Sequence, residues 1–290
     1  MTTLGAVFLP QLPPERLRSI VTAADEAGLE ELWLWEDCFL EGGLTTAAAA
    51  LAWSRRLRVG VGLLPVPLRN VAVAAMETAA LLRMFPGRAT IAVGHGVQDW
   101  MEQVGVRAAS PLTLLREYTL ALRALLAGER LSTRGSYVRL DGVALDWPPA
   151  GPAPILVGAM GPKTLRLSGE VADGTVLTAG VDADGVRRAR ALVEEGRTAA
   201  GRTGDHEIVM YLHAATGPGA EARLAAERVR WGYTGDADVL VAGDEHAIAA
   251  AVRRWAEAGV DRVILQPTPD DPDPEGFVRF VAERVRPLVP

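Results

Sequence analysis

The residues with the clearest chemistry lie at positions 158–163, GAMGPK, near the middle of the chain. The apolar run at 155–157 predicts a buried strand, and Pro162 stands where the first residue of a following helix is expected. The first amides of a helix have no partner within it, so an anion is expected to bind the amides of Ala159, Met160, Gly161 and Lys163. Lys163, the only lysine in the sequence, adds a positive charge. The alternative interpretation is a tight glycine turn without a ligand.

Polar and aromatic residues also follow other apolar runs of strand length. Three such groups are residues 35–39 (WEDCF), 62–65 (GLLP) and 94–98 (GHGVQ), and His213 and Gln266 end two later runs. Aromatic walls with few polar groups predict a pocket for a flat organic ring. A metal site is not expected, because His and Cys residues do not cluster at ligand spacing. A serine nucleophile is not expected either, because no run ends in a Gly-x-Ser-x-Gly turn.

A regular alternation of strands and helices must position these groups. Expected strands cover 6–9, 31–35, 57–63, 89–93, 155–157, a run starting at 176, 208–213 and 260–266. Expected helices cover 14–27, 45–54, 70–84, 110–127, 164–171, 184–200, 220–231, 244–258 and 274–285. About eight strand and helix pairs predict a single-domain (β/α)8 TIM barrel over residues 1–290, with a small hairpin excursion near 131–150 that turns around Asp141 and Gly142. Chemistry in such a barrel lies where the strands end.

Two segments far apart in the sequence repeat one pattern. Residues 24–34, ADEAGLEELWL, and residues 255–265, WAEAGVDRVIL, each read as a helix end, a glycine, an acidic residue and a strand. We therefore expect the first and last units of the barrel to play the same architectural part.

Composition excludes several classes of protein. The 290 residues carry a net charge of −6 and no basic run, so neither nucleic acid nor an anionic membrane surface is expected as a partner. No apolar segment approaches the roughly 20 residues that span a bilayer, and the N-terminus lacks the pattern of a signal peptide. The single cysteine, Cys38, excludes an internal disulfide and indicates a reducing compartment, so a cytoplasmic location is expected.

Four segments of the sequence carry a resemblance to a known protein family: EAGLEELWLWED at 26–37, RLRVGVGLLPVPLRN at 56–70, FPGRATIAVGHG at 85–96 and GAMGPKTLRLSGEVADG at 158–174. In this order they resemble the bacterial-luciferase-like flavin and deazaflavin oxidoreductases. The last segment is most similar to the methylene-tetrahydromethanopterin reductase branch and related actinobacterial proteins, which use the deazaflavin coenzyme F420. The resemblance implies a TIM-barrel oxidoreductase that uses F420 or, as in relatives with the same cleft, flavin mononucleotide (FMN).

The resemblance also assigns roles to residues. It implies a cis peptide between Gly62 and Leu63, under the cofactor ring. Asp37 falls where relatives carry an active-site acid or histidine, and His95 falls where some flavin-binding relatives place an arginine on the phosphate. The implied cofactor-binding residues are Gly62, Leu63, His95, Gly96, Val97, Gly158, Ala159, Met160, Gly161, Pro162 and Lys163. The chain departs from the family pattern at Cys38, where histidine is common, and at Val97, where some sugar-phosphate dehydrogenase relatives carry glutamate.

A cofactor that carries hydride leaves the protein two tasks, which are to orient the substrate and to supply a proton. Asp37 is the first candidate for the catalytic proton donor and His95 the second. The alternatives are that Asp37 caps the following turn and that His95 binds the cofactor tail. The expected walls of the substrate pocket are Trp35, Cys38, Phe39 and Trp100, with Cys38 as a small filler rather than a nucleophile.

Several functions stay open at this point. The first is hydride transfer between F420 and an unidentified small organic substrate. The second is an FMN-dependent monooxygenase that works with a separate flavin reductase, and the third is a barrel that binds a cofactor without turnover. A sugar-phosphate isomerase would also use the anion site. Because dimers are common in the family, a homodimer is one expectation.

Three polar residues outside this set also receive structural interpretations. His213 is expected to be a packed histidine at a strand end, and Glu77 a buried acid of the third helix. His206 is expected to lie on the surface in a loop.

Overall fold

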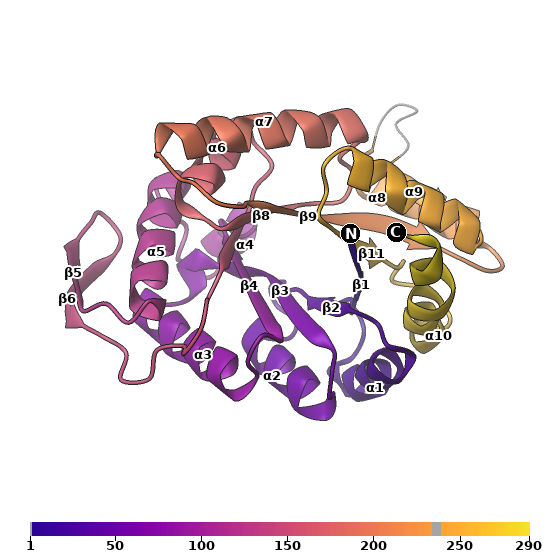
Figure 1. Ribbon diagram of the computed structural model, residues 1–290, viewed down its shortest axis with the longest axis horizontal. Coiled ribbons are helices and arrows are strands. Elements are labelled where there is room, and N and C mark those ends of the chain that lie inside the picture. The colour runs from indigo at the N-terminus through magenta and orange to yellow at the C-terminus, as the bar shows by residue number, and fades with distance from the viewer. Residues whose placement is uncertain (1, 234–238) are drawn as a thin grey trace.

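The computed structural model describes residues 2–233 and 239–290, and these residues form a closed barrel of eight parallel strands (Figure 1). The barrel strands are β1 (Thr3–Val7), β2 (Glu31–Leu34), β3 (Arg58–Pro65), β4 (Ala89–Gly94), β7 (Ile155–Gly158), β8 (Gly174–Leu177), β9 (Glu207–Ala215) and β11 (Arg262–Gln266). They pair in this order, and β11 closes the ring by pairing with both β9 and β1. The prediction of a TIM barrel is confirmed.

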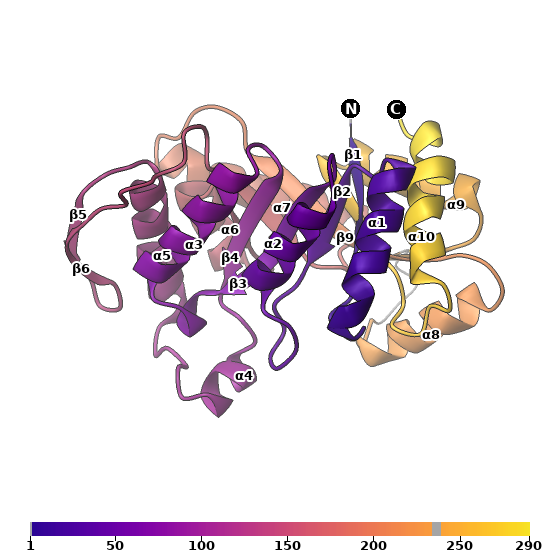
Figure 2. The ribbon, with the colours of Figure 1, turned by 90° about the horizontal axis from the view of Figure 1, so that it is seen from below.

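Helices cover the outside of the barrel between the strands. They are α1 (Leu17–Ala27), α2 (Gly43–Trp53), α3 (Val71–Met84), α5 (Pro111–Leu126), α6 (Pro162–Val171), α7 (Ala183–Ala199), α8 (Ala220–Arg230), α9 (Glu245–Glu257) and α10 (Pro274–Phe280). Short helical turns η1 (Pro14–Arg16), η2 (Val66–Leu68), η3 (Val281–Val285) and η4 (Arg286–Leu288) adjoin α1, α3 and α10. The sequence did not predict α4 (Gln98–Gln103) or the short strand β10 (Leu240–Ala242). In Figure 2, α4 lies on the side of the molecule away from the two termini.

The predicted hairpin is present, but its turn lies elsewhere than the sequence suggested. Strands β5 (Leu131–Arg134) and β6 (Arg139–Val143) pair antiparallel, and the amide of Gly135 donates to the carbonyl of Val138 at 2.9 Å to close the turn. Glu117 of α5 accepts three backbone amides of residues 136–138, which fixes this turn. Gly142, expected in the turn, instead lies within β6 at a φ of +63°, and the pairing of the two strands shifts register.

Aromatic side chains fill the barrel interior, and glycines make room for them. A Cβ on Gly60 would lie 2.4 Å from the ring of Trp33, so no side chain fits there. Tyr211 of β9 packs edge-on against Trp33 and Trp35, with ring centroids 5.9 and 5.4 Å apart. The Tyr211 hydroxyl donates to the carbonyl of Gly62 at 2.9 Å. The interior packing therefore extends to the carboxyl end of β3, where the resemblance places the cofactor ring.

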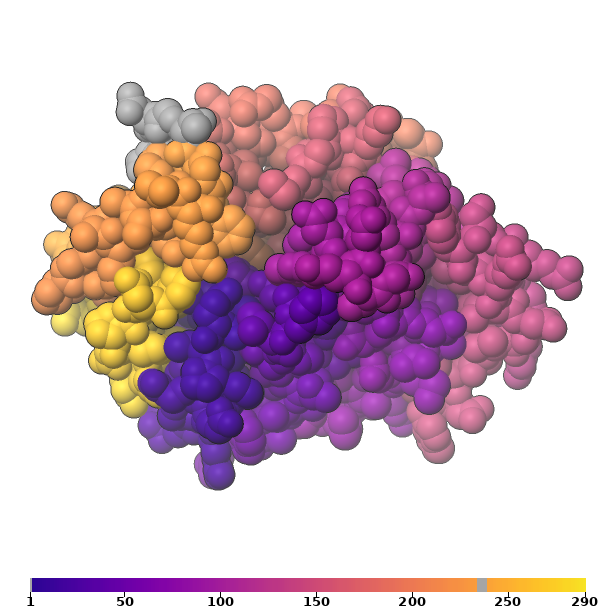
Figure 3. Space-filling model, turned by 180° about the vertical axis from the view of Figure 1, so that it is seen from behind, coloured from indigo at the N-terminus to yellow at the C-terminus, as the bar shows by residue number. Residues whose placement is uncertain are grey.

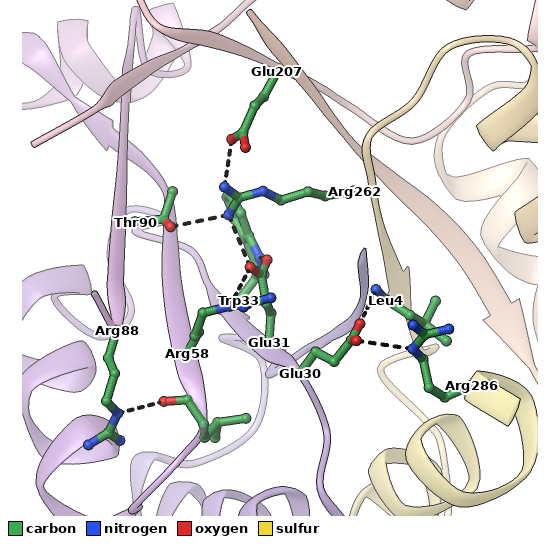
Figure 4. A network of polar contacts seen from close by, with 11 residues as sticks. Leu4, Glu30, Glu31, Trp33, Arg58, Arg88, Thr90, Glu207, Arg262 and Arg286 are labelled. Carbon is green, nitrogen blue, oxygen red and sulfur yellow. Dashed lines mark hydrogen bonds and ion pairs between the residues drawn. The ribbon is translucent and has the colours of Figure 1, made fainter. Parts of the chain in front are cut away.

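An ion-pair network around Glu31 closes the opposite, amino-terminal end of the barrel (Figure 4). Glu31 is only 2% exposed, and its Oε1 accepts hydrogen bonds from Arg58 and Arg262 at 3.0 Å each. Its Oε2 accepts the indole N–H of Trp33 at 2.9 Å, and Arg262 also donates to Glu207 at 2.6 Å. The network joins β2, β3, β9 and β11 at the end of the barrel that the sequence did not associate with function.

The two copies of the repeated sequence pattern flank β1. Gly28 and Gly259 both have a positive φ, 77° and 107°, and in both copies the next amide donates to the carbonyl five residues back. Glu31 and Arg262 occupy equivalent positions in the two copies, and they form the ion pair described above. The predicted likeness of the first and last units therefore holds for the joint and extends to the charge pair that links them.

Two predictions about single polar residues are wrong. Glu77 is 45% exposed and not buried, because it lies on the solvent side of α3, 3.5 Å from the Nε of Arg69. His206 is 9% exposed and not a surface residue, since its Nε2 lies 2.8 Å from the Oγ1 of Thr175 on β8. His213, by contrast, is fully buried at the end of β9, as predicted.

Candidate functional site

The carboxyl end of β2 carries two acidic residues, and the structure separates their roles. Glu36 is 8% exposed, pairs through both carboxylate oxygens with the guanidinium of Arg69, and accepts the amide of Gly43 at 2.8 Å. In the part of the chain that the structure describes, no Arg or Lys forms an ion pair with Asp37, and burial raises the pKa of its carboxyl group. Glu36 therefore anchors the loop after β2, while Asp37 keeps a carboxyl group that can exchange a proton.

Asp37 lines a surface cavity of about 380 Å³ formed by residues 36–42 together with Leu68 and Arg69. The Cys38–Phe39 peptide in its wall is cis, which the sequence did not predict. Burial, helped by the charges of Glu36 and Asp37, raises the pKa of the Cys38 thiol, so this residue lacks the thiolate character of a nucleophile. Phe39 is 65% exposed beside it.

The ends of β3, β4 and β7 meet at the side chain of Leu63. The Gly62–Leu63 peptide is cis, as the resemblance implies. A Cβ on Gly94 or on Gly158 would come within 2.5 or 2.2 Å of a Leu63 methyl carbon, so glycine is needed at both strand ends for Leu63 to lie there. The result is an apolar surface at the carboxyl ends of three neighbouring strands.

The backbone at the start of α6 has the geometry expected of an anion site, with one exception. The helix begins at Pro162, and Gly161 before it is extended. The amide of Ala159 donates to the carbonyl of Val176 at 3.0 Å, so the prediction that this amide points toward a ligand is wrong. The remaining amides are those of Met160, Gly161 and Lys163. Met160 is 72% exposed, and a Cβ on Gly161 would meet no atom within 4 Å, so the helix end opens to solvent.

His95, at the end of β4, belongs to the corner that contains the start of α6. Its Nε2 lies 3.1 Å from the Oγ1 of Thr164 in the first turn of that helix. Burial lowers the pKa of His95, which keeps the imidazole neutral near neutral pH. Gly96 follows with a φ of +68°, and Val97 is 47% exposed. The structure therefore links His95 to the predicted anion site rather than to the acid at β2.

The predicted site residues thus fall into two groups on one face of the barrel. Asp37 and the pocket residues Trp35, Cys38 and Phe39 follow β2, whereas the anion site follows β7. Strands β3 and β4 lie between them, and neighbouring strands are about 4.8 Å apart, so about 14 Å separates the two groups along the sheet. Figure 3 shows a hollow beside the magenta segment of α4, which carries the half-buried Trp100.

The sequence did not predict that two further residues, Glu41 and Tyr211, lie at this face. Glu41 lines the same cavity as Asp37, and burial together with the charge of Asp37 raises its pKa. Nothing in the loop sequence marked it, because its position depends on how residues 36–42 fold. Tyr211 was hidden in an apolar strand pattern, which gives no sign that its hydroxyl reaches Gly62.

Residues 2–233 and 239–290 contain no cluster of three or more His, Cys, Asp or Glu side chains suited to a metal ion. Within the same residues, no helix has the length and apolar character needed to cross a membrane.

The sequence model of the luciferase-like monooxygenase family matches residues 3–263. The chain belongs to this family. A similar protein is the 5,10-methylenetetrahydromethanopterin reductase of Methanolobus tindarius, 29% identical over 177 residues, which are 61% of this chain and 54% of the reductase. Another is the F420-dependent glucose-6-phosphate dehydrogenase of Nakamurella multipartita, 31% identical over 189 residues, which are 59% of this chain and 54% of that enzyme. The luciferase-like chain therefore spans about half the length of these two curated relatives.

A solved structure extends the likeness of fold over the whole chain. The F420-dependent secondary alcohol dehydrogenase in complex with an F420–acetone adduct superimposes with a TM-score of 0.88, covering 100% of the luciferase-like chain and 99% of the dehydrogenase. The two sequences are 20% identical, so this similarity shows the barrel fold and not the activity.

Proposed function

We propose that this luciferase-like protein is an oxidoreductase that transfers a hydride between coenzyme F420 and a small organic substrate. The observation that carries the proposal is the presence, at one barrel mouth, of a helix-end anion site at α6 and a partly buried carboxyl group at Asp37, which has no ion-pair partner among the described residues. Support for F420 comes from the glucose-6-phosphate dehydrogenase relative and the structural neighbour, which are both described as F420-dependent.

The residues present fit such a cofactor at both of its ends. The apolar surface of Leu63 and the Gly62 peptide would receive the ring. The amides of Met160, Gly161 and Lys163, with the Lys163 ammonium, would hold a phosphate of the tail, since helix starts bind anions. We assign His95 to the tail and not to catalysis, because Thr164 in the first turn of α6 is its hydrogen-bond partner.

When bound, the deazaflavin supplies the carbon that gives or takes the hydride. The chain's own residues orient the substrate and manage one proton. Because burial raises the pKa of Asp37, this carboxyl group holds a proton to a higher pH than an exposed aspartate does. Asp37 would donate that proton when the substrate is reduced and accept one in the reverse direction. Trp35, Phe39 and Trp100 would form the apolar walls, and Cys38 would fill space between them.

Titration of the purified protein with F420 and with FMN, followed by absorbance and fluorescence, tests the cofactor. We expect F420 to bind at micromolar concentrations or below and FMN to bind at least about tenfold more weakly. Tight binding of FMN without binding of F420 would overturn the proposal. Binding of F420 without turnover on a broad panel of alcohols, carbonyls and unsaturated compounds would favour a non-catalytic barrel.

Replacing Lys163 by Ala is expected to raise the Kd of F420 about fivefold, because an exposed ammonium contributes about 1 kcal/mol to a phosphate contact. The affinity for the deazaflavin chromophore without its phosphate tail should not change. Arg166→Ala is the matched control, since Arg166 lies one turn further along α6 and pairs with Glu195. Equal losses for both cofactor forms, or for both variants, would contradict the assignment of the tail to the start of α6.

We also propose that the protein is a homodimer through the outer faces of α2 and α3. Large apolar side chains are exposed there: Trp53 is 43% exposed, Val73 46%, Met76 61% and Met84 62%. The three residues of α3 are spaced as one helical stripe, and such stripes on a soluble protein mark interaction surfaces. Sedimentation should give twice the chain mass for the wild type and the single chain mass for Met76→Asp. A wild-type monomer at micromolar concentration would disprove the dimer.

A further inference from the structure

Strand β10 lies beside the carboxyl end of β9, at the mouth of the barrel. It pairs with β9 at His213 to Ala215, beyond the point where β8 stops pairing with β9 at Met210. The residues at the end of α8, just before the undescribed segment 234–238, lie beside this part of β9, where they contact His213. Two of them are aromatic, Trp231 and Tyr233.

His213 faces the barrel interior below these rings. Side chains alternate along a strand, and Val209 and Tyr211 belong to the apolar cluster inside the barrel, so His213 points the same way. It lies two residues beyond Tyr211, about 7 Å nearer the mouth. Because the Tyr211 hydroxyl contacts Gly62, His213 occupies the next layer above the proposed position of the cofactor ring.

Tyr233 is held over His213 by close contacts. The two rings lie 5.8 Å apart in an edge arrangement, and the His213 Nε2 lies 3.3 Å from the Tyr233 hydroxyl oxygen. On the other side, a Cβ on Gly180 would come within 2.3 Å of the Tyr233 ring, so the loop after β8 needs glycine there. Trp231 packs against the same histidine, with the two ring centroids 6.0 Å apart.

The hydrogen bonding of His213 determines which way the Tyr233 proton points. The Nδ1 of His213 is buried and has no partner in the described residues. An unpartnered buried N–H is rarer in proteins than an unpartnered acceptor, so the proton belongs on Nε2 and Nδ1 carries the lone pair. In that tautomer Nε2 donates to the Tyr233 oxygen, and the hydroxyl proton of Tyr233 is free for another acceptor.

The groups around His213 and Tyr233 are either neutral or paired charges. Burial, helped by the charge of Arg230, lowers the pKa of His213 to about 4, and burial with the charge of Glu227 raises that of Tyr233 to about 12. Both groups are therefore uncharged near neutral pH. Arg230 lies 3.4 Å from Glu227, whose other oxygen accepts the Trp231 indole at 2.8 Å. An anionic ligand at this corner would meet the negative charge of Glu227, and the nearby Arg230 is already paired with that carboxylate.

We propose that the Tyr233 hydroxyl, positioned by His213, donates a hydrogen bond to an uncharged carbonyl or hydroxyl oxygen of the substrate. Gln266, the register partner of His213 on β11 and 3% exposed, adds a neutral amide to the same interior face. The inference rests on the proposed function and narrows its substrate to neutral oxygenated compounds, as opposed to carboxylates or phosphates. Tyr233 is a binding residue, and His213 is a positioning residue that acts through it.

The test compares four probes that share a ring and differ in the head group: cyclohexanone, cyclohexanol, cyclohexanecarboxylate and cyclohexyl phosphate. Ligand-observed NMR measures their binding to the F420-loaded protein and to the protein alone. We expect the ketone and the alcohol to bind at least about tenfold more tightly than the two anions. Tyr233→Phe should weaken the neutral probes about tenfold, the effect of one lost hydrogen bond, and leave the anions unchanged.

Variants of the two histidines separate positioning from general damage. His213→Leu should reproduce the loss of Tyr233→Phe, and His213→Gln should recover part of it, because its amide can still donate to the Tyr233 oxygen. His206→Leu is the matched control, since His206 is also buried and its pKa is also lowered to about 4, but it lies at the amino-terminal end of β9. Thermal melts of all variants report folding.

The outcomes distinguish this inference from the proposed function. Carboxylate binding as tight as ketone binding, or wild-type selectivity in Tyr233→Phe, overturns the inference. If F420 does not bind but the protein alone prefers the neutral probes through Tyr233, the cofactor proposal fails and the neutral site stands. If F420 binds and the preference for neutral probes is absent, the neutral site fails and the cofactor proposal stands.

Discussion

Replacing Asp37 by Asn is expected to lower kcat by about 10²–10⁴-fold, the usual contribution of a positioned general acid or base. The Kd of F420 should stay within about twofold of the wild-type value, because Asp37 lies after β2 and the anion site lies after β7. Asparagine keeps the shape of the side chain and removes its exchangeable proton. Stopped-flow measurement of cofactor oxidation and equilibrium titration of cofactor binding give the two quantities separately.

The pH dependence of the same variant gives a second, independent readout. The folded protein raises the pKa of Asp37, so the protonated form persists to higher pH than in an exposed aspartate. In the direction of substrate reduction, the wild-type rate should fall as pH rises through that raised pKa, and Asp37→Asn should lose this limb. Asp99→Asn, on exposed α4 at the same face, is the control for a lost negative charge. A variant with wild-type kcat would remove Asp37 from the mechanism.

Much of the fold could be predicted because burial leaves a clear trace in the sequence. Parallel strands buried on both faces read as apolar runs, and most of the predicted strands lie within a few residues of the observed ones. The failures have local causes. The helix α4 has only six residues and one buried side chain, Met101, so it has no periodic pattern to detect. The strand β10 has three half-buried residues and exists only because β9 extends past β8.

The site was less predictable than the fold, since it depends on contacts between distant residues. Glu36 and Asp37 are adjacent in the sequence, which gives no sign that their roles differ. Only the structure shows that Arg69 forms an ion pair with Glu36 and not with Asp37. The helix-start pattern correctly indicated the geometry before α6, but it could not show that β8 uses the amide of Ala159. The sequence distinguished His213, at the end of an apolar run, from His206 in a loop, but it could not show that Thr175 of β8 buries His206 as well.

Replacing Glu31 by Ala is expected to lower the free energy of unfolding by about 3–5 kcal/mol, because Arg58 and Arg262 would lose their shared buried partner. The indole N–H of Trp33 would lose its acceptor as well. Urea denaturation followed by circular dichroism measures the change. Cofactor affinity should be retained in the folded variant, since Glu31 lies at the amino-terminal end of the barrel and the proposed site lies at the carboxyl end.

Glu30→Ala is the matched control for this prediction. Glu30 is 30% exposed, accepts the amide of Leu4 at 2.7 Å and pairs with Arg286 at the surface. Water can replace these contacts, so the expected loss is only about 1 kcal/mol. If both variants lose the same stability, the buried network is not the main contributor. In the double variant Glu31→Ala with Arg262→Ala, the loss should be smaller than the sum of the two single losses, because one of the stranded cations is gone. That coupling would show that the repeated joint on either side of β1 stabilises the barrel through its charge pair and not only through its shape.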